Sequence, residues 1–347
     1  MDDVTYARLR LPSTSPFVLT DFGRDRTVTP LHAELYRPAT TPPPWPAVVV
    51  SEGLGGVKDA RERRYGRFLA QNGFLALVVD SFATRGFHTA AHPVRAINVT
   101  ETMMVSDAFH ALAWLAERPD VDRNRIYNIG FSYGGMICIL TAYEQIRRTF
   151  LVSDDRFAAH VSYYGPTVPR LEDYRTTGAP VAILNGELDQ NFDPRRLELI
   201  VGDLSNGGSA AESIIFADTY HQWDSDDHTR RFDPFNIKRM ATRIDPANRI
   251  IDESSGHEIT SFPTRLLAIA RSVSMKGFHL MRNPDVMRET DEILLRYLVT
   301  RLDRLPDRDA RPSQENEEAS ADLPPPVRPH VVRRVTGTEA GAPDSEE

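Results

Sequence analysis

A serine stands among glycines in the sequence GFSYGG, which runs from Gly130 to Gly135. The residues from Arg125 to Phe131 alternate in polarity and end in β-forming types, whereas those from Met136 to Ile146 are apolar at helical spacing. Ser132 is therefore predicted at a sharp turn from a strand into a helix. Such a G-x-S-x-G turn exposes the serine Oγ above the carboxyl edge of a sheet, where it can attack a carbonyl carbon. The motif also arises by chance, so partners are needed to support a catalytic role.

A serine hydroxyl is a weak nucleophile until a base removes its proton and an acid orients that base. Two residues farther along the chain have the right types and order. Asp189 ends the predicted strand PVAILNGELD, and His221 follows the predicted strand ESIIFAD. Both would leave the sheet at the same edge as Ser132, which is where open α/β sheets carry their sites. Asp193 and His228 are the competing candidates, and we favour the pair that lies closer to the strand ends.

A glycine-rich loop, SEGLGG from Ser51 to Gly56, follows the strand-like run PAVVV. In a hydrolase with a serine elbow, this loop and the residue after the nucleophile donate backbone N–H groups to the oxyanion. Gly53 and Tyr133 are therefore the predicted donors. The alternative, a phosphate-binding loop, is disfavoured because GLGG lacks the G-x-G-x-x-G spacing.

Strand-like and helix-like segments alternate along most of the chain, which predicts βαβ units and a mostly parallel sheet with helices on both faces. The buried type of strand, continuous in apolar and β-branched residues, is seen in PAVVV and in FLALVVD. We predict helices at 59–73, 99–117, 193–206 and 284–302, with the strands between them. The fold class is therefore α/β, in the arrangement known as the α/β-hydrolase fold.

The chain divides into a domain at 1–302 and a tail at 303–347. The tail has seven prolines and eleven acidic residues against six arginines, and it contains no aromatic residue. A segment of this kind cannot bury enough apolar surface to offset its ordering entropy, so we predict a disordered acidic tail. Residues 223–282 break the strand–helix rhythm and are predicted to form an irregular insertion before the closing helix.

Composition excludes several classes of function. The net charge is −8 and no long basic block exists, which argues against a nucleic-acid surface. The single cysteine, Cys138, rules out an intrachain disulfide and is predicted to be a buried, inert thiol. We expect neither a signal peptide nor a membrane-spanning helix, because no suitable apolar run is present, and we expect a cytoplasmic protein.

Two histidines, His88 and His92, have the i, i+4 spacing that can hold zinc on a helix. They lack the intervening glutamate of H-E-x-x-H, and Gly86 and Pro93 interrupt a regular helix. We therefore predict no metal site and no cofactor, and one or both histidines could instead line the substrate pocket.

Over roughly residues 20–300, the sequence resembles the dienelactone hydrolase branch of the α/β-hydrolase superfamily. The matching pieces are SEGLGG, LVVDSFATRG, GFSYGG, NGELD and YHQW. The resemblance implies that Glu52 contacts the nucleophile and that Arg85 helps to hold a substrate carboxylate. The family uses a cysteine nucleophile where this chain has Ser132, which resembles the wider group of serine esterases and leaves the dienelactone substrate open.

These observations predict a hydrolase that cleaves a small-molecule carboxylic ester or lactone through an acyl-enzyme. A serine peptidase of the prolyl-oligopeptidase type is one alternative, although the segment before LHAELYRP is too short for the extra domain that such enzymes carry. A non-catalytic ligand-binding protein of the same fold is the other, and it predicts a damaged triad. Acyl and alcohol specificity and the oligomeric state stay open.

Overall fold

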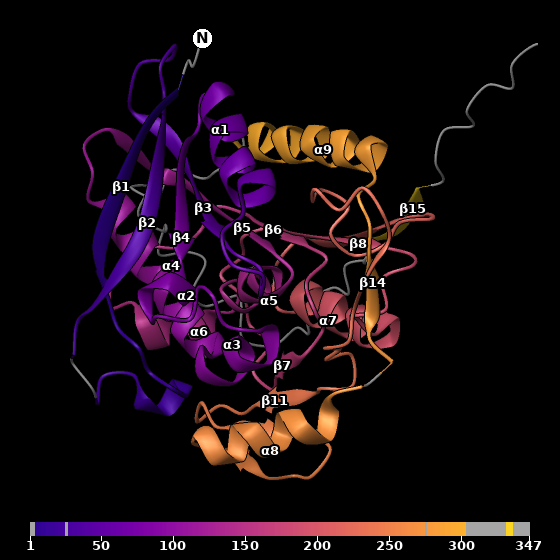
Figure 1. Cartoon of the computed structure of the whole chain (residues 1–347). Coiled ribbons are helices and arrows are strands. Elements are labelled where there is room, and N and C mark those ends of the chain that lie inside the picture. Colours follow the sequence, from indigo (N-terminus) through magenta and orange to yellow (C-terminus); the bar gives the residue numbers. More distant parts are fainter. Residues whose placement is uncertain (1–3, 25–26, 275, 303–330, 336–347) are drawn as a thin grey trace, which may run out of the picture.

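The central element of the computed structural model is a nine-stranded sheet (Figure 1). The model describes residues 4–24, 27–274, 276–302 and 331–335. In spatial order the strands are β1 (Val4–Ser13), β2 (Thr29–Pro38), β4 (Leu75–Asp80), β3 (Trp45–Ser51), β5 (Val121–Phe131), β6 (His160–Tyr163), β8 (Val181–Gly186), β9 (Ala211–Phe216) and β15 (Val331–Val335). The pairs β1–β2 and β2–β4 are antiparallel, and every later pair is parallel.

Two hydrophobic cores lie on opposite faces of this sheet, because successive side chains of a strand point to opposite sides. In β3, Ala47 and Val49 join one core, whereas Val48 and Val50 join the other. All four are fully buried, as expected for a parallel strand that is covered on both faces. The predicted α/β architecture is therefore confirmed.

Helices cover each face. The bounds are α1 (Arg64–Gln71), α2 (Ser81–Thr84), α3 (His92–Asn98), α4 (Glu101–Ala116), α5 (Tyr133–Leu140), α6 (Glu144–Phe150), α7 (Pro194–Asn206), α8 (Phe262–Ser272) and α9 (Pro284–Leu302), with single turns at Leu19–Asp21 and Asp59–Arg63. Apolar side chains of α4, α5, α6 and α7 belong to the first core, and those of α1 and α9 belong to the second. Helices α1 and α9 lie together at the top of Figure 1. None of the helices in the described ranges is both long and apolar enough to cross a bilayer.

The segment 223–282 consists of short elements grouped around α8. β10 (Arg231–Asp233) pairs with β14 (Phe278–Leu280). A second small sheet joins β11 (Thr242–Ile244), β12 (Ile250–Asp252) and β13 (Glu258–Ile259) to β7 (Pro169–Leu171). Figure 1 shows α8 and β11 at the end of the molecule opposite α9. The insertion thus has its own local hydrogen bonding and is anchored to the main domain through β7.

The prediction of a disordered tail at 303–347 is wrong for residues 331–335. Residues Val331–Val335 form β15, which pairs in parallel register with β9 at the edge of the sheet. An edge strand has unpaired N–H and C=O groups, and the run VVRRV contains three β-branched valines that suit a strand. The rest of the predicted tail, 303–330 and 336–347, lies outside the described residues.

Candidate active site

Ser132 lies at the corner where β5 ends and α5 begins. Its backbone has φ 52° and ψ −113°, a strained conformation for a residue with a side chain. The corner is tight enough that a Cβ on Gly130 would collide with the carbonyl of Gly134, and one on Gly134 would collide with that of Ser51. Glycine is therefore required on both sides of the serine. Cys138, farther along α5, is fully buried, and burial raises the pKa of its thiol well above the ordinary value.

His221 and Asp189 meet Ser132 at the carboxyl edge of the sheet. The Nε2 atom of His221 lies 3.0 Å from Ser132 Oγ, and its Nδ1 atom lies 2.7 Å from Asp189 Oδ2. The other carboxylate oxygen of Asp189 accepts a hydrogen bond of 2.8 Å from the amide of Asn191. Both ring nitrogens of the histidine are thus occupied, one by a carboxylate and the other by the hydroxyl group.

Packing fixes the histidine ring. The side chain of His221 is fully buried and makes edge contacts with the rings of Tyr164 and Phe278, at centroid distances of 4.7 Å and 4.9 Å. The hydroxyl of Tyr164 donates a 2.5 Å hydrogen bond to the buried carboxylate of Asp224. Ser132 is 6% exposed and lines a cavity together with Leu54 and Phe278. Neither Tyr164 nor Asp224 was identified from the sequence, because only the fold brings them behind the histidine.

The two competing candidates lie elsewhere. The Asp193 side chain caps α7 by accepting a hydrogen bond of 3.0 Å from the Arg195 amide. His228 is exposed, and its amide bonds to the carbonyl of Asp226 within a turn of the insertion. The structure therefore brings Asp189 and His221 to Ser132, rather than the alternatives.

The loop at 51–56 differs from the prediction in one respect. The amide of Gly53 donates to Glu62 Oε1 at 3.2 Å, and the same carboxylate pairs with the guanidinium of Arg61 at 2.7 Å. Both charged residues are buried, although the charge run in which they lie reads as a surface helix. The Gly53 N–H group is therefore engaged in this structure. Tyr133 is the first residue of α5, and an amide at this position has no acceptor within its own helix.

Among the described residues, no hydrogen bond joins Glu52 to Ser132, the contact that the resemblance implied, and Glu52 Oε2 is buried without a hydrogen-bond partner. Its Oε1 atom accepts a hydrogen bond of 2.9 Å from the amide of Phe82, at the start of α2. Burial raises the pKa of this carboxyl well above its ordinary value, and the nearby Asp80 adds to the rise. Glu52 is therefore a buried group whose environment favours the protonated form, and it links the loop to α2.

Arg85 is likewise directed away from the site. Its guanidinium pairs with Asp107 at 2.7 Å and donates to the carbonyl groups of Thr14 and Ser81. Asp107 is fully buried and also accepts a hydrogen bond from Ser13. The N–H groups of Arg85 are thus used by the buried carboxylate of Asp107 and by backbone carbonyl groups. The expected contact between Arg85 and a substrate carboxylate is therefore not supported.

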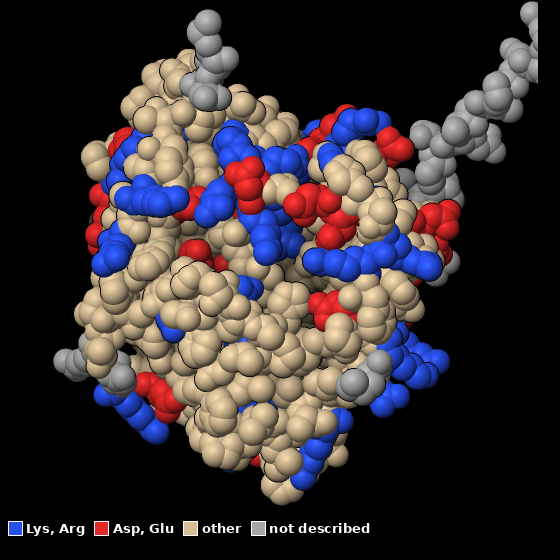
Figure 2. Space-filling model, in the orientation of Figure 1, with Lys and Arg blue, Asp and Glu red and all other residues tan. Residues whose placement is uncertain are grey.

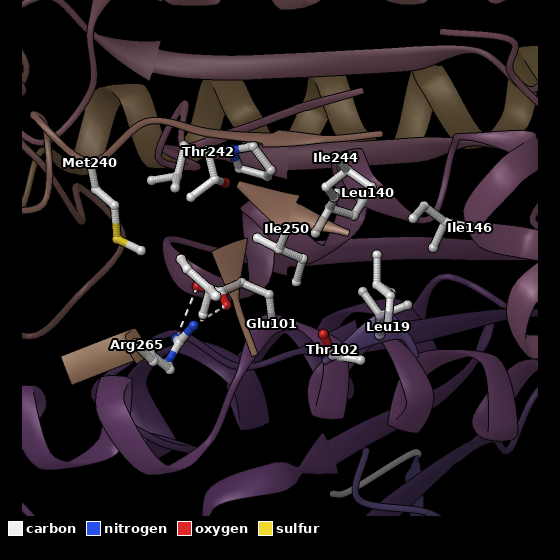
Figure 3. A pocket seen from close by; sticks show the side chains of 14 residues that line it. Leu19, Glu101, Thr102, Leu140, Ile146, Met240, Thr242, Ile244, Ile250 and Arg265 are labelled. Atoms are coloured by element: carbon white, nitrogen blue, oxygen red, sulfur yellow. Dashed lines mark hydrogen bonds and ion pairs between the residues drawn. The ribbon is translucent and has the colours of Figure 1, made fainter. Parts of the chain in front are cut away.

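An ion pair from the insertion reaches the residue next to the nucleophile. Arg265 of α8 pairs with Glu101 at 2.7 Å and donates a hydrogen bond of 3.0 Å to the Tyr133 hydroxyl, which itself donates to the Val99 carbonyl. Burial opposes the charge of Glu101, but the guanidinium holds its pKa below the ordinary value. Figure 3 shows this pair at one end of an apolar pocket that also contains Ile250. The insertion is thus tied directly to the start of α5.

Charged side chains of both signs occur together on the surface. On the face shown in Figure 2, blue and red side chains are interspersed, with wide tan areas between them. Arg64 pairs with Asp291, and Arg231 pairs with Asp227. Within the described ranges, no group of three or more potential ligands is placed to hold a metal ion.

Comparisons with known proteins agree with this architecture. The model of the dienelactone hydrolase family matches residues 31–244. A protein of Escherichia coli O157:H7 assigned as a carboxymethylenebutenolidase is 25% identical over 197 residues, or 55% of this chain and 72% of that protein. A crystal structure from Klebsiella pneumoniae, assigned as a dienelactone hydrolase, has a TM-score of 0.50 at 22% identity and covers 63% of this chain and 88% of the other.

A second solved structure with this fold is a thermophilic esterase of Thermogutta terrifontis, with a TM-score of 0.44 and 19% identity over 56% of this chain and 81% of that one. The family match spans β2 to β11 and so includes the serine corner, the loop at 51–56 and the residues that meet there. The chain therefore belongs to the dienelactone hydrolase family and is a hydrolase with the α/β-hydrolase fold.

Proposed function

We propose that this protein hydrolyses a carboxylic ester or lactone through an acyl-enzyme, with Ser132 as nucleophile, His221 as base and Asp189 as the acid that orients the base. The observation that carries the proposal is the pair of contacts made by His221, 3.0 Å to the serine hydroxyl and 2.7 Å to the carboxylate. A histidine held in this way accepts the serine proton at Nε2 while Nδ1–H stays with the carboxylate.

In the first half of the reaction, Ser132 Oγ forms a bond to the ester carbonyl carbon and its proton passes to His221 Nε2. The carbonyl oxygen becomes an oxyanion. When this intermediate collapses, the bond to the leaving alcohol breaks and the alcohol oxygen takes the proton from His221. Asp189 stabilises the transient imidazolium without itself becoming protonated.

In the second half, a water molecule takes the place of the alcohol. His221 removes one water proton as the oxygen attacks the acyl carbon, and it then returns a proton to Ser132 Oγ as the acid leaves. The buried position of His221 supports this double role, because a ring clamped between two aromatic rings keeps the same orientation in both steps.

Two backbone amides would hold the oxyanion. Tyr133 N–H is the first, because a helix begins there and directs its free amide and positive dipole end toward the serine. We assign the second to Leu54, since the Gly53 amide already serves Glu62 and Leu54 lines the same cavity as Ser132. By analogy with other oxyanion holes, losing one donor costs about 3–4 kcal/mol of transition-state stabilisation.

The experiment is turnover of p-nitrophenyl acetate by the purified full chain. We expect measurable hydrolysis that falls at least about a thousand-fold in Ser132→Ala, since the residual rate of such enzymes is small once the nucleophile is lost. Equal rates for the two proteins would contradict the proposal. Turnover confined to peptide substrates would support the peptidase alternative, and none in a folded protein would support a binding role.

A further inference from the structure

The space around Ser132 has two parts of opposite character. The part next to the serine is small, about 20 Å³, and most of its wall is apolar. The apolar side chains come from the loop at 51–56, from the turn after β6 and from the insertion: Leu54, Pro166, Phe235, Ile237 and Phe278. An apolar lining beside the serine, with the Asp233 carboxyl group also in the wall, favours a short acyl chain without a negative charge.

A larger cleft of about 360 Å³ adjoins this cavity and shares Gly55, His92 and Gln222 with it. Its remaining wall is polar and is formed by Lys58, Ala60, Arg61, Ser225, Asp226, Asp227 and Arg231. A group that leaves the serine through this cleft must therefore be hydrophilic, because an apolar group would displace water from charged side chains without compensation.

The charges of the cleft nearly cancel. Arg61 is paired with Glu62 at 2.7 Å, and Arg231 with Asp227 at 3.3 Å. The two other charged side chains of the wall, Lys58 and Asp226, have opposite signs. A wall of this kind offers many hydrogen-bonding groups without a net field, which favours a neutral hydroxyl-bearing group over a carboxylate or a phosphate.

His92 stands at the junction of the two spaces. Its Nδ1 atom lies 2.7 Å from Asp233 Oδ2, and Asp233 also accepts a 2.8 Å hydrogen bond from the Phe235 amide. Burial alone would raise the pKa of Asp233, but these two hydrogen bonds hold it below the ordinary value, which favours Asp233 as the acceptor of a hydrogen bond from His92 Nδ1–H. The other ring nitrogen is on the side of Gly55, since a Cβ there would lie 3.9 Å from Nε2.

In the tautomer that donates Nδ1–H to Asp233, His92 presents an acceptor at Nε2 to the shared wall. A lone pair accepts a hydrogen bond from a hydroxyl group and has nothing to donate to a carboxylate. We propose that the substrate is a short-chain acyl ester of a neutral polyol, with the acyl chain beside Ser132, the polyol in the adjoining cleft and a polyol hydroxyl bound to His92 Nε2. This inference rests on the proposed ester hydrolysis and specifies its substrate class.

The test compares glycerol 1-acetate with propyl acetate, which has the same skeleton without the two hydroxyl groups, by the rate of acetate release. The quantity measured is the ratio of the two kcat/KM values. We expect the wild-type protein to prefer the glycerol ester roughly ten-fold or more, as the loss of one or two substrate hydrogen bonds implies. Acetoxyacetate, whose alcohol half carries a carboxylate, should show no preference over propyl acetate.

Two variants distinguish a hydrogen bond from His92 to the substrate from a purely structural role, in which His92 only holds the insertion through Asp233. His92→Asn keeps a donor to Asp233 but loses the acceptor at Nε2, so the ratio should fall toward one. His92→Gln keeps an acceptor at the Nε2 position and loses the contact with Asp233, so it should retain most of the preference. His110→Asn, a histidine of α4 outside both spaces, is the matched control and should leave the ratio unchanged.

Three results decide the matter. A wild-type ratio near one, or an unchanged ratio in His92→Asn, would overturn the polyol assignment while p-nitrophenyl acetate turnover leaves the ester hydrolysis standing. A ratio that falls in His92→Gln but not in His92→Asn would show that His92 acts only structurally, through its contact with Asp233. Absence of turnover with every ester, in a folded protein, would overturn the proposed function and this inference with it.

Discussion

The Nε2 atom of His221 lies 3.0 Å from the Oγ atom of Ser132, although 89 positions separate the two residues in the chain. The contact exists because β5 and β9 run in the same direction, so the turns that follow them meet at one edge of the sheet. Asp189, in the turn after β8, lies between them along the chain and completes the array.

Replacing Asp189 by Asn tests whether the carboxylate orients the base. Asn has nearly the same shape but only one oxygen, which the Asn191 amide holds, so its NH2 group faces His221 Nδ1. The NH2 group donates to Nδ1, and the ring proton of His221 then lies on Nε2, facing the serine. We expect kcat for p-nitrophenyl acetate to fall about 10⁴-fold with little change in KM. Asp193→Asn, which changes the cap of α7, is the control and should retain the wild-type kcat. Similar losses in the two variants would contradict the assignment.

Tyr133→Phe tests the tie between the insertion and the serine corner. The change removes one hydrogen bond from Arg265 and one to the Val99 carbonyl, both buried. We expect a loss of about 1–3 kcal/mol in the free energy of unfolding and a lower kcat at similar KM, because the adjacent oxyanion amide is less well fixed.

The control for this prediction is Tyr127→Phe. That tyrosine is also buried and lies on β5, but it belongs to the hydrophobic core on the opposite face of the sheet from Tyr133, where its hydroxyl lies 3.5 Å from the Leu298 carbonyl. It should leave kcat unchanged. A Tyr133→Phe protein with wild-type kcat would show that Arg265 only stabilises the fold.

The buried carboxyl of Glu52 should make stability depend on pH. Its native pKa is raised well above the ordinary value of 4.5, so at pH values between the two the folded protein binds one proton more than the unfolded chain. Its contribution is therefore fully present below about pH 4.5 and is lost as the pH rises toward the native pKa. Glu52→Gln is neutral throughout and keeps an acceptor for the Phe82 amide.

We expect the Tm of Glu52→Gln, relative to wild type, to increase as the pH rises above the ordinary value of 4.5. Differential scanning calorimetry across this range measures the difference directly. Glu187→Gln, at an exposed position, serves as the comparison and should show no such trend. A constant Tm difference for Glu52→Gln would mean that the carboxyl is ionised in the folded protein.

Features that are determined by a short stretch of sequence could be predicted from the sequence. The turn at Ser132 follows from glycine spacing, and the positions of Asp189 and His221 follow from where apolar strand runs end. The helix at 284–302 was predicted with the bounds that α9 has. In each case a short stretch of sequence carries enough information, because the constraint acts within one or two turns of the chain.

The remaining features depend on contacts between distant residues. Nothing near Arg85 indicates that it would pair with Asp107, and nothing near Gly53 indicates that Glu62 would take its amide proton. The pairing of His92 with Asp233 joins α3 to the insertion across 141 positions. β1 was missed for a related reason, because a half-exposed edge strand lacks a continuous apolar run.

The central claim is that Ser132 is an activated nucleophile, and the most direct measurement is labelling with a fluorophosphonate followed by peptide mapping with mass spectrometry. We predict one stoichiometric adduct on Ser132, no adduct in Ser132→Ala, and slower labelling in Asp189→Asn, because the base is then misoriented. An adduct on another serine, or a folded wild-type protein that resists labelling while Ser132→Ala keeps full ester turnover, would contradict the account.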